Sequence, residues 1–239
     1  MTEPAPIRIA YRFTFKDGRV RDFALVLDRS TLQVIAAPRN VYPEWTALSY
    51  KKCPNCPLDE ARHPRCPVAT NLVDVVEAFK DVRSFEEVDV SVDVPERRYL
   101  KRAPVQQALS AMIGVLTAAS GCPVLDKLRP MVQTHLPFMS PEESTYRLIG
   151  MYLLAQYFRD KQGLQPDWDL DQLVRLLEEC RQTNAGLVRR LQTLGITDAT
   201  LNALAELNTM GEISSLSIED DLKRLEKIFG DHYGRRAPA

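Results

Sequence analysis

The chain has 239 residues, of which 45% are hydrophobic and 26% are charged, and its formal net charge is -1. This balance is typical of a folded globular protein and gives no overall positive charge to attract nucleic acid or anionic lipid. No apolar stretch approaches the roughly 18 residues that a membrane span needs, and the N-terminal residues lack the pattern of a secretory signal. We therefore predict a cytoplasmic protein, in a reducing compartment, that binds neither nucleic acid nor membranes.

The first part of the chain has the alternation of apolar residues that is typical of β-strands. Apolar residues occupy every second position over 7–15, and Asp17-Gly18 is a hairpin turn signal. Strands are also predicted at 23–27 and 32–35, and alternating valines predict a fourth at 88–94. Together these segments indicate a small antiparallel sheet of four strands.

A helix is predicted at 67–83, where apolar residues recur at helical spacing. Pro67 suits the first helical position, because its missing N–H would have no partner there, and this places Cys66 at or next to the N-cap. The chain is predicted to be helical from about residue 103 onward, with segments at 105–116, 123–132, 140–161, from 167 or 169, 198–210 and 217–229.

These elements predict an α+β protein with two parts. Residues 1–102 form a β-meander domain with four antiparallel strands, one helix and a cysteine-rich loop, and residues 103–233 form an all-α helical domain. The tail 234–239 is predicted to be disordered. Basic residues at 97–102 indicate a solvated edge between the two parts.

Four of the five cysteines directly precede proline, namely Cys53, Cys56, Cys66 and Cys122. Proline makes up about 5% of an average protein, so chance gives fewer than one such pair among five cysteines. Three of the four lie in one short loop that also contains His63. This pattern indicates a metal site, since clustered cysteines in a reducing compartment favour metal over structural disulfides.

The spacing within the loop predicts a structural zinc site of Cys3His type. Cys53 and Cys56 are separated by two residues, as are His63 and Cys66, and such pairs present two ligands to one ion. A thiolate at Cys66 would also be stabilised by the positive end of the predicted helix.

Three other interpretations remain open. Cys122 carries the same Cys-Pro-Val sequence as Cys66, so it is an alternative ligand in place of His63. Four cysteines could then hold an iron–sulfur cluster, since a Cys-Pro step occurs at the final ligand of bacterial ferredoxin motifs. The cysteines could instead be buried small hydrophobic residues without metal, or Cys53 and Cys56 a redox pair, although Pro57 follows them and no βαβ unit surrounds them.

A second candidate site pairs Cys122 with His135. A thiol beside an imidazole is a pattern typical of nucleophilic catalysis. The two residues are thirteen positions apart, and no third residue that would orient the histidine is evident. The competing interpretation is that both residues only pack in the core, as we predict for Cys180.

Several motifs carry a resemblance over roughly residues 45–210. They are Cys53-Pro-Asn-Cys-Pro-Leu58, Cys66-Pro-Val-Ala69, Ser120-Gly-Cys-Pro-Val-Leu-Asp-Lys-Leu-Arg-Pro-Met131, His135-Leu-Pro-Phe138 and Met151-Tyr-Leu-Leu-Ala-Gln-Tyr-Phe158. In these motifs the chain resembles a family of uncharacterised bacterial proteins. The resemblance implies a bacterial cytoplasmic protein and no particular activity.

The leading prediction is a binding or regulatory module whose cysteine-rich loop is held by a structural zinc ion, with a protein or small molecule as its partner. The alternative prediction is an iron–sulfur or thiol-based redox sensor or enzyme that uses Cys122 and His135.

Overall fold

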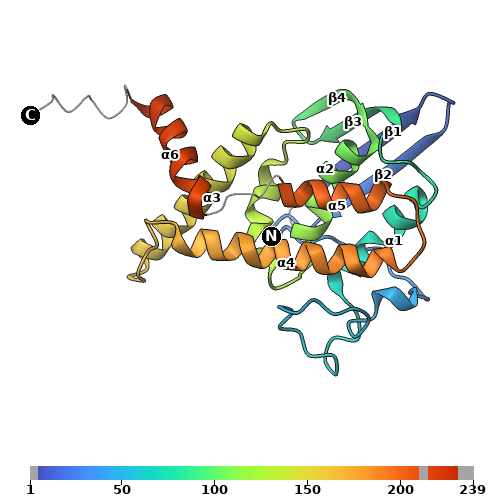
Figure 1. Ribbon diagram of the computed structural model, residues 1–239, viewed down its shortest axis with the longest axis horizontal. Coiled ribbons are helices and arrows are strands. Elements are labelled where there is room, and N and C mark those ends of the chain that lie inside the picture. Colours follow the sequence, from blue (N-terminus) through green and yellow to red (C-terminus); the bar gives the residue numbers. More distant parts are fainter. Residues whose placement is uncertain (1–4, 210–214, 231–239) are drawn as a thin grey trace, which may run out of the picture. The chain divides into compact units, whose positions relative to one another are not determined.

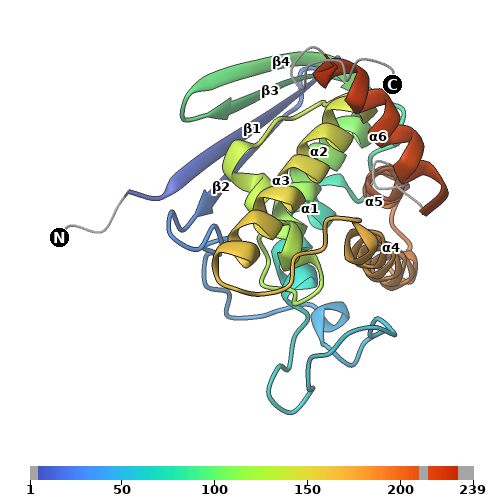
Figure 2. The same cartoon turned by 90° about the vertical axis from the view of Figure 1, so that its left-hand side faces the viewer.

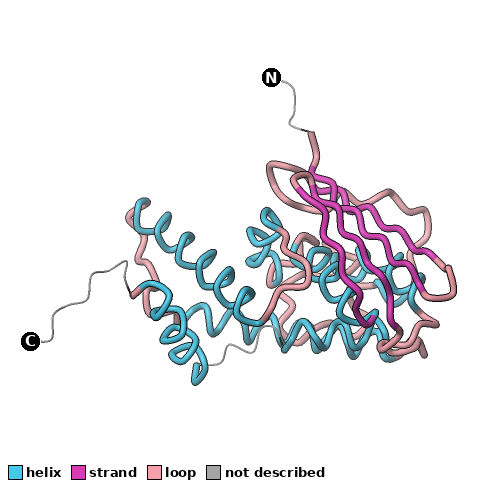
Figure 3. The backbone as a smooth tube through the Cα atoms, turned by 90° about the horizontal axis from the view of Figure 1, so that it is seen from above, coloured by secondary structure: helices cyan, strands magenta, loops and turns pink. Residues whose placement is uncertain are grey.

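The computed structural model describes residues 5–209 and 215–230. It contains one antiparallel sheet in the strand order β2-β1-β3-β4 (Figures 1 and 3). The strands are β1 (Ile7–Phe15), β2 (Val20–Leu27), β3 (Glu87–Val94) and β4 (Arg97–Pro104). The predicted α+β class with a four-stranded antiparallel sheet is confirmed.

The described helices lie close to their predicted positions. They are α1 (Pro67–Phe79), α2 (Val105–Ala118), α3 (Pro141–Lys161), α4 (Asp171–Gln192), α5 (Ala199–Thr209) and α6 (Ser215–Phe229), with 3-10 helices η1 (Glu44–Thr46) and η2 (Leu125–Thr134). α1 ends before the predicted position 83, and the segment predicted as a helix at 123–132 is a 3-10 helix. Among the described helices, none is both long enough and apolar enough to cross a membrane.

One predicted strand is wrong, and one strand of the structure was not predicted. The segment 32–35 forms only a single bridge, from Val34 to Leu27, and the fourth strand is instead β4. The residues of β4 were predicted to form a solvated domain edge because four of the eight are basic, and in the structure only Ala103 of this strand is buried. Charged side chains are typical of an edge strand, since they discourage pairing with another chain.

The sheet buries one face against helices, as Figure 2 shows. Along β1 the alternate residues Ile9, Tyr11 and Phe13 are buried, and the Phe13 ring meets the Phe79 ring of α1 edge-on at 5.1 Å. The opposite face carries ion pairs between strands, including one of 2.7 Å between Arg12 and Asp22. The alternation that predicted β1 therefore separates a core face from a solvent face.

The chain forms two compact units. The first consists of residues 1–138 and 179–209, and the second of 139–178 and 210–239. The sheet, α1, α2, η2, α5 and the second part of α4 belong to the first unit, so the predicted domain boundary at 102 and 103 falls inside it. The predicted disordered tail, 234–239, lies outside the described residues.

Asp198 connects the start of α5 to the segment before β3. Its carboxylate accepts hydrogen bonds from the Ser84 backbone N–H, at 2.9 Å, and from the Ser84 hydroxyl, at 2.8 Å. The backbone hydrogen bond from Ser84 is the largest of the effects that together hold the pKa of Asp198 below its ordinary value of 3.8. A lowered pKa in the folded state means that ionised Asp198 stabilises the fold above that ordinary value and loses this effect as the pH falls further.

We therefore expect Asp198→Asn to be less stable than the wild type near neutral pH. The difference in the free energy of unfolding should shrink as the pH falls below about 3.8, where the wild-type carboxylate becomes protonated. Urea unfolding from pH 3 to pH 7 measures this difference. A difference in the free energy of unfolding between the two proteins that stays constant over that pH range would contradict the prediction.

Candidate metal centre

The Cys53–Cys56 turn packs against the second half of α4. Figure 1 shows the 40–66 segment, coloured blue to cyan, beside this helix. The Cys56 N–H donates to the Cys53 carbonyl at 3.1 Å and closes the turn. The side-chain amide of Asn55 donates to the Glu179 carbonyl at 2.8 Å and to the Thr183 hydroxyl at 3.1 Å. Asn55 thereby fixes the position of both cysteines relative to α4.

The Cys53 sulfur lies directly over Gly186 of α4. A Cβ atom added to Gly186 would lie 2.5 Å from Cys53 Sγ and 3.2 Å from Cys53 Cβ, which is too close for a side chain. The protonated Cys53 thiol donates a weak hydrogen bond to the Thr183 carbonyl at 3.6 Å. Glycine at 186 is therefore needed for the approach of the turn to the helix.

Cys66 is the N-cap of α1, with Pro67 at the first helical position, as predicted. Its N–H donates to the Thr46 carbonyl at 2.8 Å, and the Leu48 N–H donates to the Pro64 carbonyl at 3.0 Å. These two hydrogen bonds hold residues 46–48 and 64–66 against each other. Cys66 is buried at the N-terminal end of α1.

Cys122 reaches the same region from the end of α2. Gly121 has a φ of +84°, which turns the chain sharply before the buried Cys122. Burial raises the pKa of the Cys122 thiol, while hydrogen bonds from the backbone N–H groups of Leu125 and Val124 act in the opposite direction. N–H groups directed at a sulfur are also a feature of metal-bound thiolates, whose properties they tune.

The charges of neighbouring thiolates would raise the pKa values of Cys53 and Cys122. Cys53 interacts in this way with Cys56, Cys66 and Cys122, and Cys122 interacts with Cys56 and Cys66. Burial raises the pKa of Cys53 from 9.0 to about 11, and the neighbouring Cys66 adds to this effect. Cys122, which is distant in the sequence, thereby joins the three cysteines of the loop.

His63 has a different environment from these cysteines. It is exposed, and its backbone N–H donates to the Asp59 carbonyl at 2.8 Å. Among the described residues, no three His, Cys, Asp or Glu side chains are arranged to hold a metal ion. The zinc site of Cys53, Cys56, His63 and Cys66 stays a prediction.

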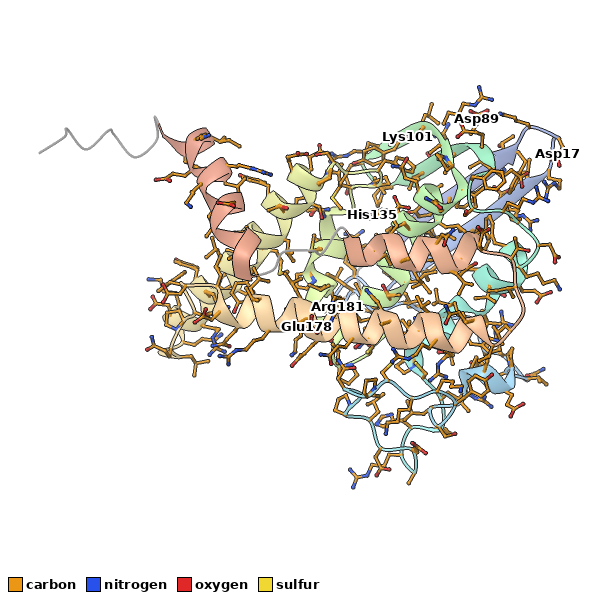
Figure 4. All side chains as sticks on the ribbon, in the orientation of Figure 1. Asp17, Asp89, Lys101, His135, Glu178 and Arg181 are labelled. Carbon is orange, nitrogen blue, oxygen red and sulfur yellow. The ribbon has the colours of Figure 1, made fainter. Side chains whose placement is uncertain are left out.

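Cys122 and His135 lie at opposite ends of η2. The ten residues of this 3-10 helix separate them, and such a helix rises about 2 Å per residue. His135, labelled in Figure 4, forms a 2.5 Å hydrogen bond through Nε2 with the hydroxyl of the buried Tyr11. Burial raises the pKa of Tyr11. The catalytic pairing of Cys122 with His135 gains no support from these contacts.

Cys180 of α4 is buried, as predicted. Burial raises its pKa to about 12, and the electrostatic interaction with Cys122 contributes in the same direction. The fifth cysteine thus adjoins the site although no proline follows it.

The contacts with α4 are the part of the site that the sequence interpretation missed. Asn55 looks like an ordinary turn residue, but Gly186 stands inside a long helical pattern, where an isolated glycine often has a packing reason. Arg190, one turn after Gly186, donates from Nη1 to the carbonyls of Trp45 and Ala47, both at 2.6 Å. It thereby holds the segment that pairs with the residues before Cys66.

No curated protein and no solved structure matches this chain. A family model described as "Domain of unknown function (DUF6901)" matches residues 9–230. The match confirms the prediction of an uncharacterised family, whereas it carries no information about the Cys-Pro motifs. Since the match covers nearly the whole sequence, the chain belongs to the DUF6901 family.

Proposed function

We propose that this protein is an iron–sulfur protein of regulatory type, in which Cys53, Cys56, Cys66 and Cys122 ligate one cluster. The observation that carries the proposal is the burial of Cys122, together with the buried Cys53 and Cys66, at a position where the charge of one thiolate would affect the pKa of another. Four cysteine thiolates are the usual ligand set of such clusters.

The proposal of a cluster in place of a single zinc ion is supported by the number of cysteines, since four of them carry the Cys-Pro motif. A structural zinc ion needs four ligand atoms at about 2.0–2.3 Å from one point. No three suitable side chains of the described residues are arranged around one ion, and Cys53, Cys66 and Cys122 are buried whereas Cys56 is partly exposed.

The cluster would tie a poorly packed loop to the rest of the first unit. Residues 59–65 of the loop are all exposed, so this segment contributes little to the core. Its neighbours Cys56 and Cys66 would be fixed by the cluster to Cys122 and, through Cys53, to α4. The conformation of the loop would then depend on whether the cluster is bound, which is the property of a regulatory module.

Anaerobic purification followed by elemental analysis and a visible absorption spectrum tests the proposal. We expect a brown protein with iron and acid-labile sulfide, because four thiolates bind these clusters in the absence of oxygen. A colourless protein with about one zinc ion per chain would overturn the iron–sulfur assignment in favour of the zinc-held module. A protein without either metal, with all five cysteines freely reactive, would overturn the proposed metal centre itself.

A further inference from the structure

The second unit carries most of the large apolar side chains that are exposed in the structure. Of the twelve such side chains in the described part of the chain, seven belong to this unit, although it is the smaller of the two. They are Tyr146, Leu154, Tyr157, Phe158, Leu164, Trp168 and Ile228. Single exposed apolar residues are ordinary on a protein surface, whereas a gathered set marks a surface that binds another molecule.

Four of these side chains form one stripe along α3. Tyr146, Leu154, Tyr157 and Phe158 are each between 48% and 55% exposed, and their spacing places them on one side of the helix. The buried residues of α3 occupy the opposite side, and they are Ser144, Leu148, Ile149, Tyr152 and Gln156. α3 is therefore apolar on both sides, which is typical of a helix that packs against a neighbour on each side.

The rings of the stripe are held in place and still remain accessible. The Tyr157 and Phe158 rings meet edge-on at 5.6 Å, and Lys161 Nζ lies 5.3 Å from the centre of the Tyr157 ring. The Tyr146 ring stacks on Phe229 of α6 at 6.3 Å and is 49% exposed. Because these contacts already orient the rings, less conformational entropy is lost when a partner binds them.

The charged residues at the two ends of α3 are opposite in sign. Glu142 and Glu143 lie in its first turn, and Arg159 and Lys161 lie in its last turn. This placement stabilises the helix itself through its dipole. It also makes the stripe complementary to a second copy in antiparallel orientation, because each acidic end then faces a basic end. A parallel copy would bring like charges together, which is unfavourable.

The positions of the residues along α3 match an antiparallel pair whose twofold axis lies at the level of residue 152. Glu143 and Lys161 are each nine positions from that level, and Tyr146 and Phe158 are each six positions from it. Such an axis places Glu143 of one copy opposite Lys161 of the other. It also brings Tyr146 of one copy to the level of Phe158 of the other, so the aromatic residues of the two copies meet at both ends.

Leu154 lies nearest to this axis, two positions from its level, so the Leu154 side chains of the two copies meet near the centre of the contact. A half-exposed aromatic side chain offers roughly 100 Å². Four large side chains from each copy therefore bury roughly 800 Å² in total, and flanking residues add to this area. Since standard interfaces bury about 1,600 Å², we expect a weak dimer with a dissociation constant in the micromolar range.

We propose that the stripe of Tyr146, Leu154, Tyr157 and Phe158 is a dimerisation surface, on which α3 of a second copy of this chain packs in antiparallel orientation. One self-complementary surface serves both copies, as in other twofold dimers. The inference goes beyond the proposed function and requires no metal. The metal centre and the dimer are therefore tested independently of each other.

Sedimentation equilibrium of the whole 239-residue chain, from low to high micromolar concentration, tests the proposal. The wild type is expected to pass from monomer to dimer over this range. Leu154→Asp should raise the dissociation constant by about 100-fold or more, because it places two carboxylates beside each other at the axis. Leu154 is 55% exposed within one copy, so the substitution should leave the fold intact.

Leu100→Asp is the matched control, since it makes the same change at an exposed leucine of β4 in the first unit. It should leave the dissociation constant unchanged. A wild type that stays monomeric over the whole range would overturn the proposal, and the stripe would then bind another segment or another protein. A dimer that survives Leu154→Asp, or that Leu100→Asp dissociates, would show that the copies meet elsewhere.

Lys161→Glu tests the orientation of the two helices. In the antiparallel pair this change sets acidic residues against each other at both ends, so it should weaken the dimer by about 5- to 10-fold at low salt. The difference from the wild type should shrink as salt is added, because salt screens exposed charges. A tighter dimer of Lys161→Glu would mean that the Lys161 side chains of the two copies face each other, which contradicts the antiparallel arrangement.

Discussion

Replacing Cys122 by serine is expected to abolish the metal centre as completely as replacing Cys56. Burial raises the pKa of Cys122, the hydrogen bonds from Leu125 and Val124 oppose this effect, and electrostatic effects link Cys122 to the three cysteines of the loop. Because binding of a metal to the folded state stabilises that state, its loss should also lower the free energy of unfolding. The decrease should be about 4 kcal/mol for a centre present at about a thousand times its dissociation constant. Iron and sulfide content, together with chemical unfolding under anaerobic conditions, measures both effects.

Two controls make this prediction specific. Cys180→Ala removes a buried thiol that interacts with Cys122 but belongs to no Cys-Pro motif, and His63→Ala removes an exposed side chain. Both variants should keep the iron and the sulfide. A centre that survives Cys122→Ser but is lost from His63→Ala would contradict the four-thiolate assignment and restore the predicted Cys3His set.

Replacing Gly186 by alanine is expected to destabilise the protein, although the same change inside a helix is normally favourable by up to about 1 kcal/mol. The new methyl group would lie 2.5 Å from the Cys53 sulfur and 3.4 Å from the Cys53 Cα atom, so the turn must move away from α4. Forcing an extra methyl group into a packed contact costs about 1–3 kcal/mol. The displaced Cys53 should also weaken the metal centre.

Gly150→Ala provides the matched control for this second prediction. Gly150 lies inside α3, and a Cβ atom there would meet nothing within 4 Å. Urea unfolding should show that Gly150→Ala is as stable as the wild type or more stable, while Gly186→Ala is less stable. Equal stabilisation by both substitutions would mean that Cys53 does not pack on Gly186.

The elements with strong local patterns could be predicted from the sequence. The alternation in β1 and the helical stripe of α1 each depend on neighbours in the chain, and each is present. β4 could not be predicted in the same way, because an edge strand with one buried residue has almost no alternation of burial. The segment 32–35 has the composition of a strand, but it forms only one bridge to β2.

In the candidate site, too, the features set by neighbours in the sequence could be predicted, and those set by contacts between distant segments could not. Spacing alone identified the cysteine-rich loop and the position of Cys66 at the start of a helix. It did not decide between His63 and Cys122, because that choice depends on where the chain after α2 returns to the loop. Arg190 looks like half of a solvated Arg-Arg pair, although it falls one turn after Leu187 on the apolar stripe of α4. That placement is the signal from which its burial could have been predicted.

X-ray absorption at the iron edge of the anaerobically purified protein tests the four-thiolate centre most directly. The account predicts that every iron atom has a first shell of sulfur alone, with further iron atoms at short distance, because cysteine thiolates and bridging sulfides are its only ligands. A first shell that contains nitrogen would place a histidine in the ligand set. A protein that holds zinc in place of iron, or a single iron without iron neighbours, would equally contradict an iron–sulfur cluster held by Cys53, Cys56, Cys66 and Cys122.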